Sequence, residues 1–186
     1  MSTYIGVIAE DNSDVEVIEE IIAKKKSRHS FKIKKFVGHS CGKVRTKCHE
    51  WARILSIQNC SILILLHDLD ENLVDDLRQD LEQKLQPSPI ASHIIAIPVR
   101  EIKAWLLADH EAVNKTFGLS LKKIPNPESI RRPKEYLRDL VYLRSQKRRV
   151  YINTAHNGKI AGKSTLRQLC RCQSFVPLND FLGKAL

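Results

Sequence analysis

The feature that most constrains this chain is a six-residue run, 61–66, that is apolar throughout after its first serine. A strand covered by helices on both faces needs such a run, because neither face meets water. Two further β-rich apolar runs occupy residues 4–9 and 94–99, and segments with helical periodicity separate the three. The alternation predicts an α/β sandwich, with a mostly parallel central sheet of four to five strands and helices on both faces.

Other elements follow from local patterns. Residues 31–37 alternate apolar and basic side chains, which indicates an edge strand with one wet face. Ser13 to Glu16 has the S-x-x-E pattern that begins a helix. A fifth strand is expected at 150–153. Further helices are expected at 43–57, 72–85, 101–108, 134–147 and about 160–169.

Size and composition indicate one globular domain. The 186 residues are 42% hydrophobic and 28% charged, an ordinary balance for a chain that buries a core. We expect a core at 1–110 and a basic extension at 111–186 that packs on it. No apolar stretch is long enough to span a bilayer, so we expect a cytoplasmic protein with no membrane partner. The five cysteines, an odd number, are expected to be reduced thiols.

The positive charge of this chain lies in its C-terminal part. Residues 1–110 hold 15 basic against 16 acidic side chains, whereas residues 111–186 hold 16 against 5. Such asymmetry favours a polyanionic partner, and we expect DNA or RNA. The alternative is a basic protein that binds no nucleic acid, because net charge by itself gives only non-specific attraction.

Carboxylates follow each of the three apolar runs. Glu10 and Asp14 follow the first, Asp68 and Asp70 the second, and Glu101 the third. The carboxyl ends of parallel strands meet at one edge of a sheet, and crowded carboxylates repel one another unless a cation or protons neutralise them. Hard divalent cations prefer oxygen ligands. The five acids therefore predict a Mg²⁺ or Mn²⁺ site. Taken singly, some of them are also explained as helix-start residues.

These residues resemble a known family. Glu10 with Asp14, Asp68-Leu69-Asp70, and the segment from Arg100 to Leu106 are similar to the Toprim domain, above all to small stand-alone Toprim-like proteins of the OLD (overcoming lysogenization defect) nuclease type. The resemblance covers about residues 4–110, with weaker echoes near Lys159 and Lys163.

The resemblance implies a Rossmann-like sheet and phosphodiester hydrolysis of DNA or RNA. It implies that Glu10, Asp68 and Asp70 are catalytic and that Lys163 or Lys159 stabilises the transition state. The metal ligands that it implies are Glu10, Asp14, Asp68, Asp70 and Glu101. It also implies an ATPase partner encoded nearby and a role in defence against phage or foreign DNA. The main alternative is a non-catalytic subunit that binds nucleic acid or a partner protein around a structural cation. A lysine, Lys103, where relatives often have an acid favours that alternative.

A basic segment around the expected 134–147 helix is the candidate nucleic-acid surface. Lysine and arginine contacts to phosphates give salt-sensitive, sequence-independent affinity, although a solvated helix face has the same composition. The candidate contacts are Arg131, Arg132, Lys134, Arg144, Lys147, Arg148, Arg149 and Lys159.

Two further motifs are weaker. Residues 158–164 resemble a phosphate-binding loop that is one residue too short, because Asn157 stands where the first glycine is needed. His39, Cys41, Cys48 and His49 have zinc-ligand chemistry, but their spacing matches no known finger.

Overall fold

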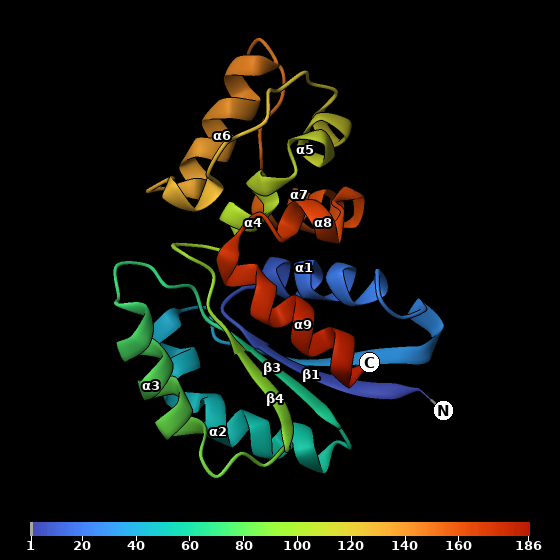
Figure 1. The fold of residues 1–186 in the computed structure, drawn as a ribbon, viewed down its shortest axis with the longest axis vertical. Helices are drawn as coiled ribbons and strands as arrows, with labels where there is room; N and C mark the ends of the chain where they lie inside the picture. Colours follow the sequence, from blue (N-terminus) through green and yellow to red (C-terminus); the bar gives the residue numbers. More distant parts are fainter. Residues whose placement is uncertain (1) are drawn as a thin grey trace.

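The computed structural model describes residues 2–186 and contains one parallel sheet (Figure 1). The strand order is β2-β1-β3-β4, and all three neighbouring pairs are parallel. The strands are β1 (Thr3–Ala9), β2 (Phe31–Val37), β3 (Ile62–Leu66) and β4 (Ser92–Ala96). The predicted α/β sandwich is confirmed, with four strands, β3 inside the sheet and β2 at an edge.

Helices cover both faces of this sheet. Figure 1 shows α2 and α3 on one face and α1 and α9 on the other, while α5 and α6 lie farthest from the sheet. None of the helices described in residues 2–186 has the length and apolar character needed to cross a membrane. The helices are α1 (Asn12–Ala23), α2 (Cys41–Ile57), α3 (Val74–Leu85), α4 (Lys103–Ala108), α5 (His110–Phe117), α6 (Pro133–Arg144), α7 (Asn153–Lys163), α8 (Leu166–Leu169) and α9 (Val176–Ala185).

Strand β3 explains why its sequence is apolar without interruption. Ile62, Ile64 and Leu66 belong to the core between the sheet and α1, whereas Leu63 and Leu65 belong to the core between the sheet and α2 and α3. Successive side chains of a strand point to opposite faces, so a strand covered on both sides must be apolar at every position.

The C-terminal part builds the face of the sheet that carries α1. Helix α7 packs along α1, and α9 packs against β4. The buried side chain of Phe175 meets Trp105 edge to face, with ring centroids 5.1 Å apart. One hydrophobic core thus includes side chains from both 1–110 and 111–186.

Some predicted elements differ from the structure. Residues 150–153 do not form a fifth strand, because the Ile152 amide donates to His156 Nδ1 at 3.0 Å instead of to a neighbouring strand. Residues 158–163 lie inside α7 and form no phosphate-binding loop. Strand β4 ends at Ala96, three residues earlier than the apolar run.

We predict that Phe175→Ala lowers the free energy of unfolding by about 3–5 kcal/mol, because it removes a fully buried ring from the shared core. Chemical denaturation followed by circular dichroism measures the change. Phe181→Ala, at a partly buried position in α9, is the matched control and should cost less. Equal stability of the wild type and Phe175→Ala would show that the C-terminal part adds little to the fold.

Candidate functional site

The five predicted acids line one cavity at the carboxyl ends of the strands. Glu10 follows β1, Asp68 and Asp70 follow β3, and Glu101 follows β4, while Asp14 stands in the first turn of α1. The cavity has a volume of about 370 Å³, and we call it the acidic pocket. Its lining consists of Glu10, Asp11, Asp14, Cys41, Asp68, Asp70, Glu101, Lys103, Lys134 and Asn153.

Backbone pairing beyond the strand ends brings these residues together. The His67 amide donates to the Ala96 carbonyl at 3.1 Å, and the Asp70 amide donates to the Arg100 carbonyl at 3.0 Å. The segments that follow β3 and β4 therefore stay side by side for several residues. On the other flank, the His39 amide donates to the Glu10 carbonyl at 2.8 Å, which holds the end of β1 against the turn into α2.

Unusual backbone angles gather at the same edge. His39, Asp70 and Arg100 follow β2, β3 and β4, and their φ angles are 59°, 50° and 63°. A left-handed conformation costs a residue with a side chain roughly 1–2 kcal/mol. Such strain concentrates at functional sites, where the surrounding structure holds it in place. Three of the six non-glycine residues with positive φ in residues 2–186 thus follow strand ends at this edge, and the other three, Asn59, Gln146 and Lys147, lie elsewhere.

A buried lysine stands among the acids. Lys103 Nζ lies 3.2 Å from Asp14 Oδ1, and the two side chains are 7% and 4% exposed. Burial by itself lowers the pKa of Lys103, but the charges of Asp14 and Asp68 outweigh burial and raise it, so the ammonium stays charged. Burial raises the pKa of Asp14, and Lys103 opposes that rise. Lys103 is therefore a permanent internal cation of the acidic pocket.

One ammonium does not neutralise the remaining acids. Asp68 Oδ1 accepts a hydrogen bond from the Ile102 amide at 3.0 Å, yet burial raises the pKa of Asp68 well above its ordinary value. Burial also raises the pKa of Glu101. Six carboxylates and only two amines line the pocket, so the carboxylates lack positive charge.

The Cys41 side chain joins two strand ends. Its thiol donates to Glu10 Oε2 at 2.6 Å and lies 3.3 Å from Asp70 Oδ2. Burial, followed by hydrogen bonding to Glu10, raises the pKa of Cys41, so the thiol keeps its proton. Sequence analysis did not assign Cys41 to this site. The available signal was its position just after β2, at the same edge of the sheet as the acids.

The carboxylates that line the acidic pocket are chemically suited to a hard divalent cation. Carboxylate oxygens are the ligands that Mg²⁺ and Mn²⁺ prefer. Burial raises the pKa values of Asp68 and Glu101, and the charge of Lys103 opposes both shifts. Within residues 2–186, however, no three acidic, histidine or cysteine side chains are arranged to enclose an ion. The Cys41 thiol stands between Glu10 and Asp70, and Cys48 lies apart from it in the apolar core.

The two lysines predicted to assist catalysis lie outside the acidic pocket. Lys163 Nζ donates to the Lys115 carbonyl at 2.9 Å, and Lys159 lines a separate cavity opposite Glu16 and Glu20. Their helix, α7, packs along α1, and its C-terminal half lies away from the strand ends. The expected role of Lys163 is therefore corrected: the lysines at the acids are Lys103 and Lys134.

The other predicted phosphate contacts are spread around α6. Lys134 lines the acidic pocket, and the charges of Arg131 and Arg132 act on nearby Glu71, which pairs with Arg100 at 2.7 Å. Arg144 lies at the far end of α6. Lys147, Arg148 and Arg149 are exposed beyond it. A positive surface thus extends from the acidic pocket along α6.

A buried hydrogen-bond network supports the floor of the pocket. Tyr151 donates from its hydroxyl to Asn157 Oδ1, and Asn157 Nδ2 donates to Ser13 Oγ at 3.1 Å. Asn157 and Ser13 are completely buried. The network ties α7 to the start of α1, next to Asp14, and sequence analysis did not find it.

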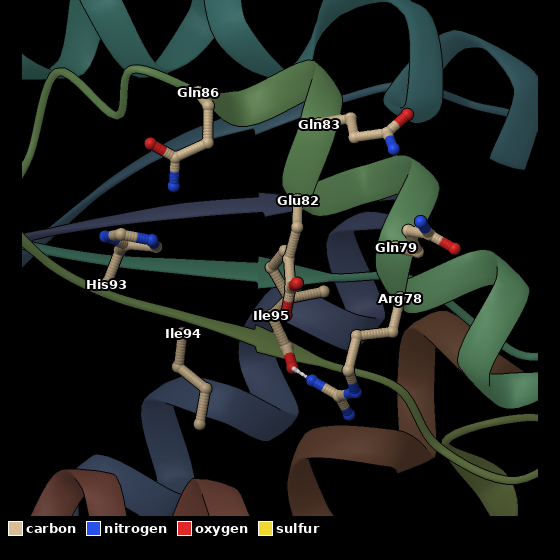
Figure 2. Close-up of a pocket in the computed structure, with 8 residues that line it drawn as sticks. All are labelled: Arg78, Gln79, Glu82, Gln83, Gln86, His93, Ile94 and Ile95. Atoms are coloured by element: carbon tan, nitrogen blue, oxygen red, sulfur yellow. Dashed lines mark hydrogen bonds between the residues drawn. The ribbon is translucent and has the colours of Figure 1, made fainter.

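A larger cavity than the acidic pocket lies elsewhere. It has a volume of about 660 Å³ and is bounded by α3 and the outer edge of β4 (Figure 2). Figure 2 shows the Arg78 guanidinium reaching the Ile95 carbonyl, a hydrogen bond of 3.3 Å. Glu82 is the single carboxylate among the residues that line this cavity, whereas six carboxylates line the smaller acidic pocket.

We predict that Lys103→Met lowers the free energy of unfolding by about 3–5 kcal/mol in chelator, because it leaves Asp14 buried without a partner. Urea denaturation measures this change. The double variant Lys103→Met with Asp14→Leu should recover part of the loss. A Lys103→Met protein as stable as wild type would mean that the ion pair contributes nothing to the fold.

We predict that Asp68→Asn stabilises the cation-free protein at pH 8. Because the folded-state pKa of Asp68 is raised, its ionisation favours the unfolded chain. The advantage of the variant should therefore be absent below about pH 4, the pKa in the unfolded chain, and grow as pH rises toward the folded-state pKa. Denaturation in chelator between pH 3.5 and 8 measures it. A constant difference across that range would contradict the assignment.

Comparison with known proteins gives one result. A family described as a domain of unknown function, DUF4276, matches residues 9–183. The matched range contains every residue that lines the acidic pocket. No curated protein and no solved structure matches the chain. Since the family covers nearly the whole sequence, this protein belongs to the DUF4276 family.

Proposed function

We propose that this protein is a Mg²⁺- or Mn²⁺-dependent nuclease that hydrolyses phosphodiester bonds in DNA or RNA. One observation carries the proposal: acids from three separate strand ends line a single cavity that is short of positive charge. Isolated acids at helix starts do not produce that convergence. A basic surface beside the cavity suits a polyanionic substrate.

The carboxylates that would hold the cation are Glu10, Asp14, Asp68, Asp70 and Glu101. The cation would supply charge stabilisation at phosphorus and a more acidic bound water. Lys103 holds Asp14 in place, and the Ile102 amide holds Asp68, so neither carboxylate needs to reorganise during the reaction. Burial raises the pKa of Asp68, so this carboxylate binds a proton more readily than an ordinary aspartate does.

Positive side chains next to the pocket would hold the substrate. The exposed ammonium of Lys134 borders the acids and is suited to a phosphate oxygen next to the scissile bond. Arg131 and Arg132 extend this positive charge toward Glu71. Contacts of this kind give affinity without sequence preference and weaken as salt rises.

The resemblance to OLD-type Toprim proteins supports two further parts of the proposal. Proteins of that type are commonly joined to ATPases, so we propose a separate ATPase partner and a role in defence against foreign DNA. Both rest on the resemblance and not on the geometry of the acidic pocket.

A non-catalytic binding subunit is the second candidate. The observation that favours it is the Lys103 ammonium, which already neutralises Asp14 without any metal. In that case the acids would hold a structural cation or none. The basic surface would then bind the nucleic acid or the partner protein.

Incubation of the protein with plasmid, single-stranded DNA and tRNA in Mn²⁺ or Mg²⁺ tests the proposal. We expect cutting that EDTA abolishes and that Asp68→Asn and Asp70→Asn each reduce at least about 100-fold, since each removes a charge that acts on the reacting centre. Lys134→Gln should weaken the reaction by about tenfold or less.

Two variants control this experiment. Asp76→Asn removes an exposed carboxylate from α3, outside the acidic pocket, and should cut like wild type. Lys163→Gln should do the same, because its amine lies away from the acids. Binding of nucleic acid without any cutting, with or without a co-purified ATPase, would favour the binding subunit instead.

A further inference from the structure

A second cavity lies on α6, lined by different residues from the acidic pocket. It has a volume of about 370 Å³, and its lining includes Lys122, Lys123, Ile124, Tyr136, Leu140 and Arg144. We call it the tyrosine pocket. Tyr136, Leu140 and Arg144 recur at every fourth position of α6, so they share one side of that helix. Lys134, by contrast, lines the acidic pocket.

Residues 120–125 form one wall of the tyrosine pocket, and hydrogen bonds hold this segment in place. Asn114 accepts from the Leu121 amide at 2.7 Å and donates to the Leu121 carbonyl at 3.2 Å. Arg171 donates to the carbonyls of Ile124 and, at 3.0 Å, Pro125. A segment without helix or strand is therefore held at both ends by hydrogen bonds from side chains outside it. A preformed wall reduces the entropy lost when a ligand binds.

The lining combines an aromatic ring, an apolar floor and positive charge. Tyr136 is 41% exposed, and Leu140 and Ile124 are packed against the core. Lys122, Lys123 and Arg144 contribute three exposed cations, and no carboxylate in the described chain lines this cavity. A planar, apolar group bearing an anion has the complementary chemistry, and a nucleotide is such a group.

We propose that the tyrosine pocket binds one base and its phosphate from a single-stranded nucleic acid whose neighbouring part lies at the acidic pocket. The base stacks on Tyr136, and Lys122, Lys123 and Arg144 face the phosphates. The identity of this ligand rests on the proposed function. An α-helix with its side chains is about 10–12 Å across, so a strand of a few nucleotides reaches from one side of α6 to the other.

A paired duplex does not offer the face of an inner base, because its neighbours already stack on both sides. An unpaired strand does, and stacking on an aromatic side chain tolerates any base. The tyrosine pocket therefore selects single strands over duplexes without reading sequence, and it adds affinity at a distance from the acids.

The test is fluorescence anisotropy with a labelled twelve-nucleotide thymidine oligomer, measured in EDTA so that no cutting occurs. We expect Tyr136→Leu to weaken binding about 5- to 100-fold and Tyr136→Phe to retain it, because the ring and not the hydroxyl makes the contact. The matched control is Tyr142→Leu, a tyrosine of the same helix with 40% exposure that does not line the cavity. It should bind within twofold of wild type.

Two further arms separate the possible ligands. A duplex of the same length should bind with equal affinity to wild type and Tyr136→Leu, and thymidine monophosphate alone should bind far more weakly than the oligomer. Arg144→Gln should lower the slope of log affinity against log salt by about 0.7, whereas Lys184→Gln, on α9, should leave it unchanged.

Unchanged oligomer binding by Tyr136→Leu, with circular dichroism confirming its fold, would overturn the inference. Binding of the monophosphate as tightly as the oligomer would also overturn it, since the pocket would then serve a free nucleotide. Hydrolysis of a small phosphodiester in Mn²⁺ keeps the two proposals apart. Tyr136→Leu should retain that hydrolysis, and Asp68→Asn should lose it while still binding the oligomer.

Discussion

The contact between Lys103 and Asp14 is the interaction on which the functional end of this protein depends. It joins α4, which follows β4, to α1, which follows β1, at a point where both side chains are almost completely buried. Separating the two charges would leave Asp14 buried without its partner at high cost. The pair therefore fixes the start of α4 against the start of α1 beside the remaining acids.

The rest of the acidic pocket is arranged around that fixed point. Backbone pairing carries Asp68 and Asp70 toward Arg100, and the Cys41 thiol donates a hydrogen bond to Glu10. Left-handed backbone at His39, Asp70 and Arg100 surrounds the same cavity. Hydrogen bonds and one buried ion pair thus hold acids from separate strands at one edge of the sheet.

Sequence patterns predicted the sheet and its acids well because both depend on local chemistry. Uninterrupted apolar runs locate buried strands, and the residue that follows a strand must lie at the edge of the sheet. Sequence patterns did not predict where the Lys163 side chain lies. The face of α7 that packs against α1 is set by contacts between segments more than a hundred residues apart. The strand predicted at 150–153 was wrong for a similar reason, because the Ile152 amide donates to a histidine in α7 and not to another strand. Lys103 was visible only as an odd basic residue near acids, and its burial could not be read from composition.

The position of α7 and α9 has a consequence for synthesis on the ribosome. All four strands have been synthesised once Ala96 is added to the chain. At that point one face of the sheet still lacks α9, and α1 still lacks α7. The core around apolar side chains on that face, including Ile64 and Ile94, is complete only when the last part of the chain has folded. During this interval the nascent chain exposes an apolar face of the sheet that can aggregate. Chaperone binding or rapid translation of the final segment therefore protects this protein more than it protects a fold whose core is completed early.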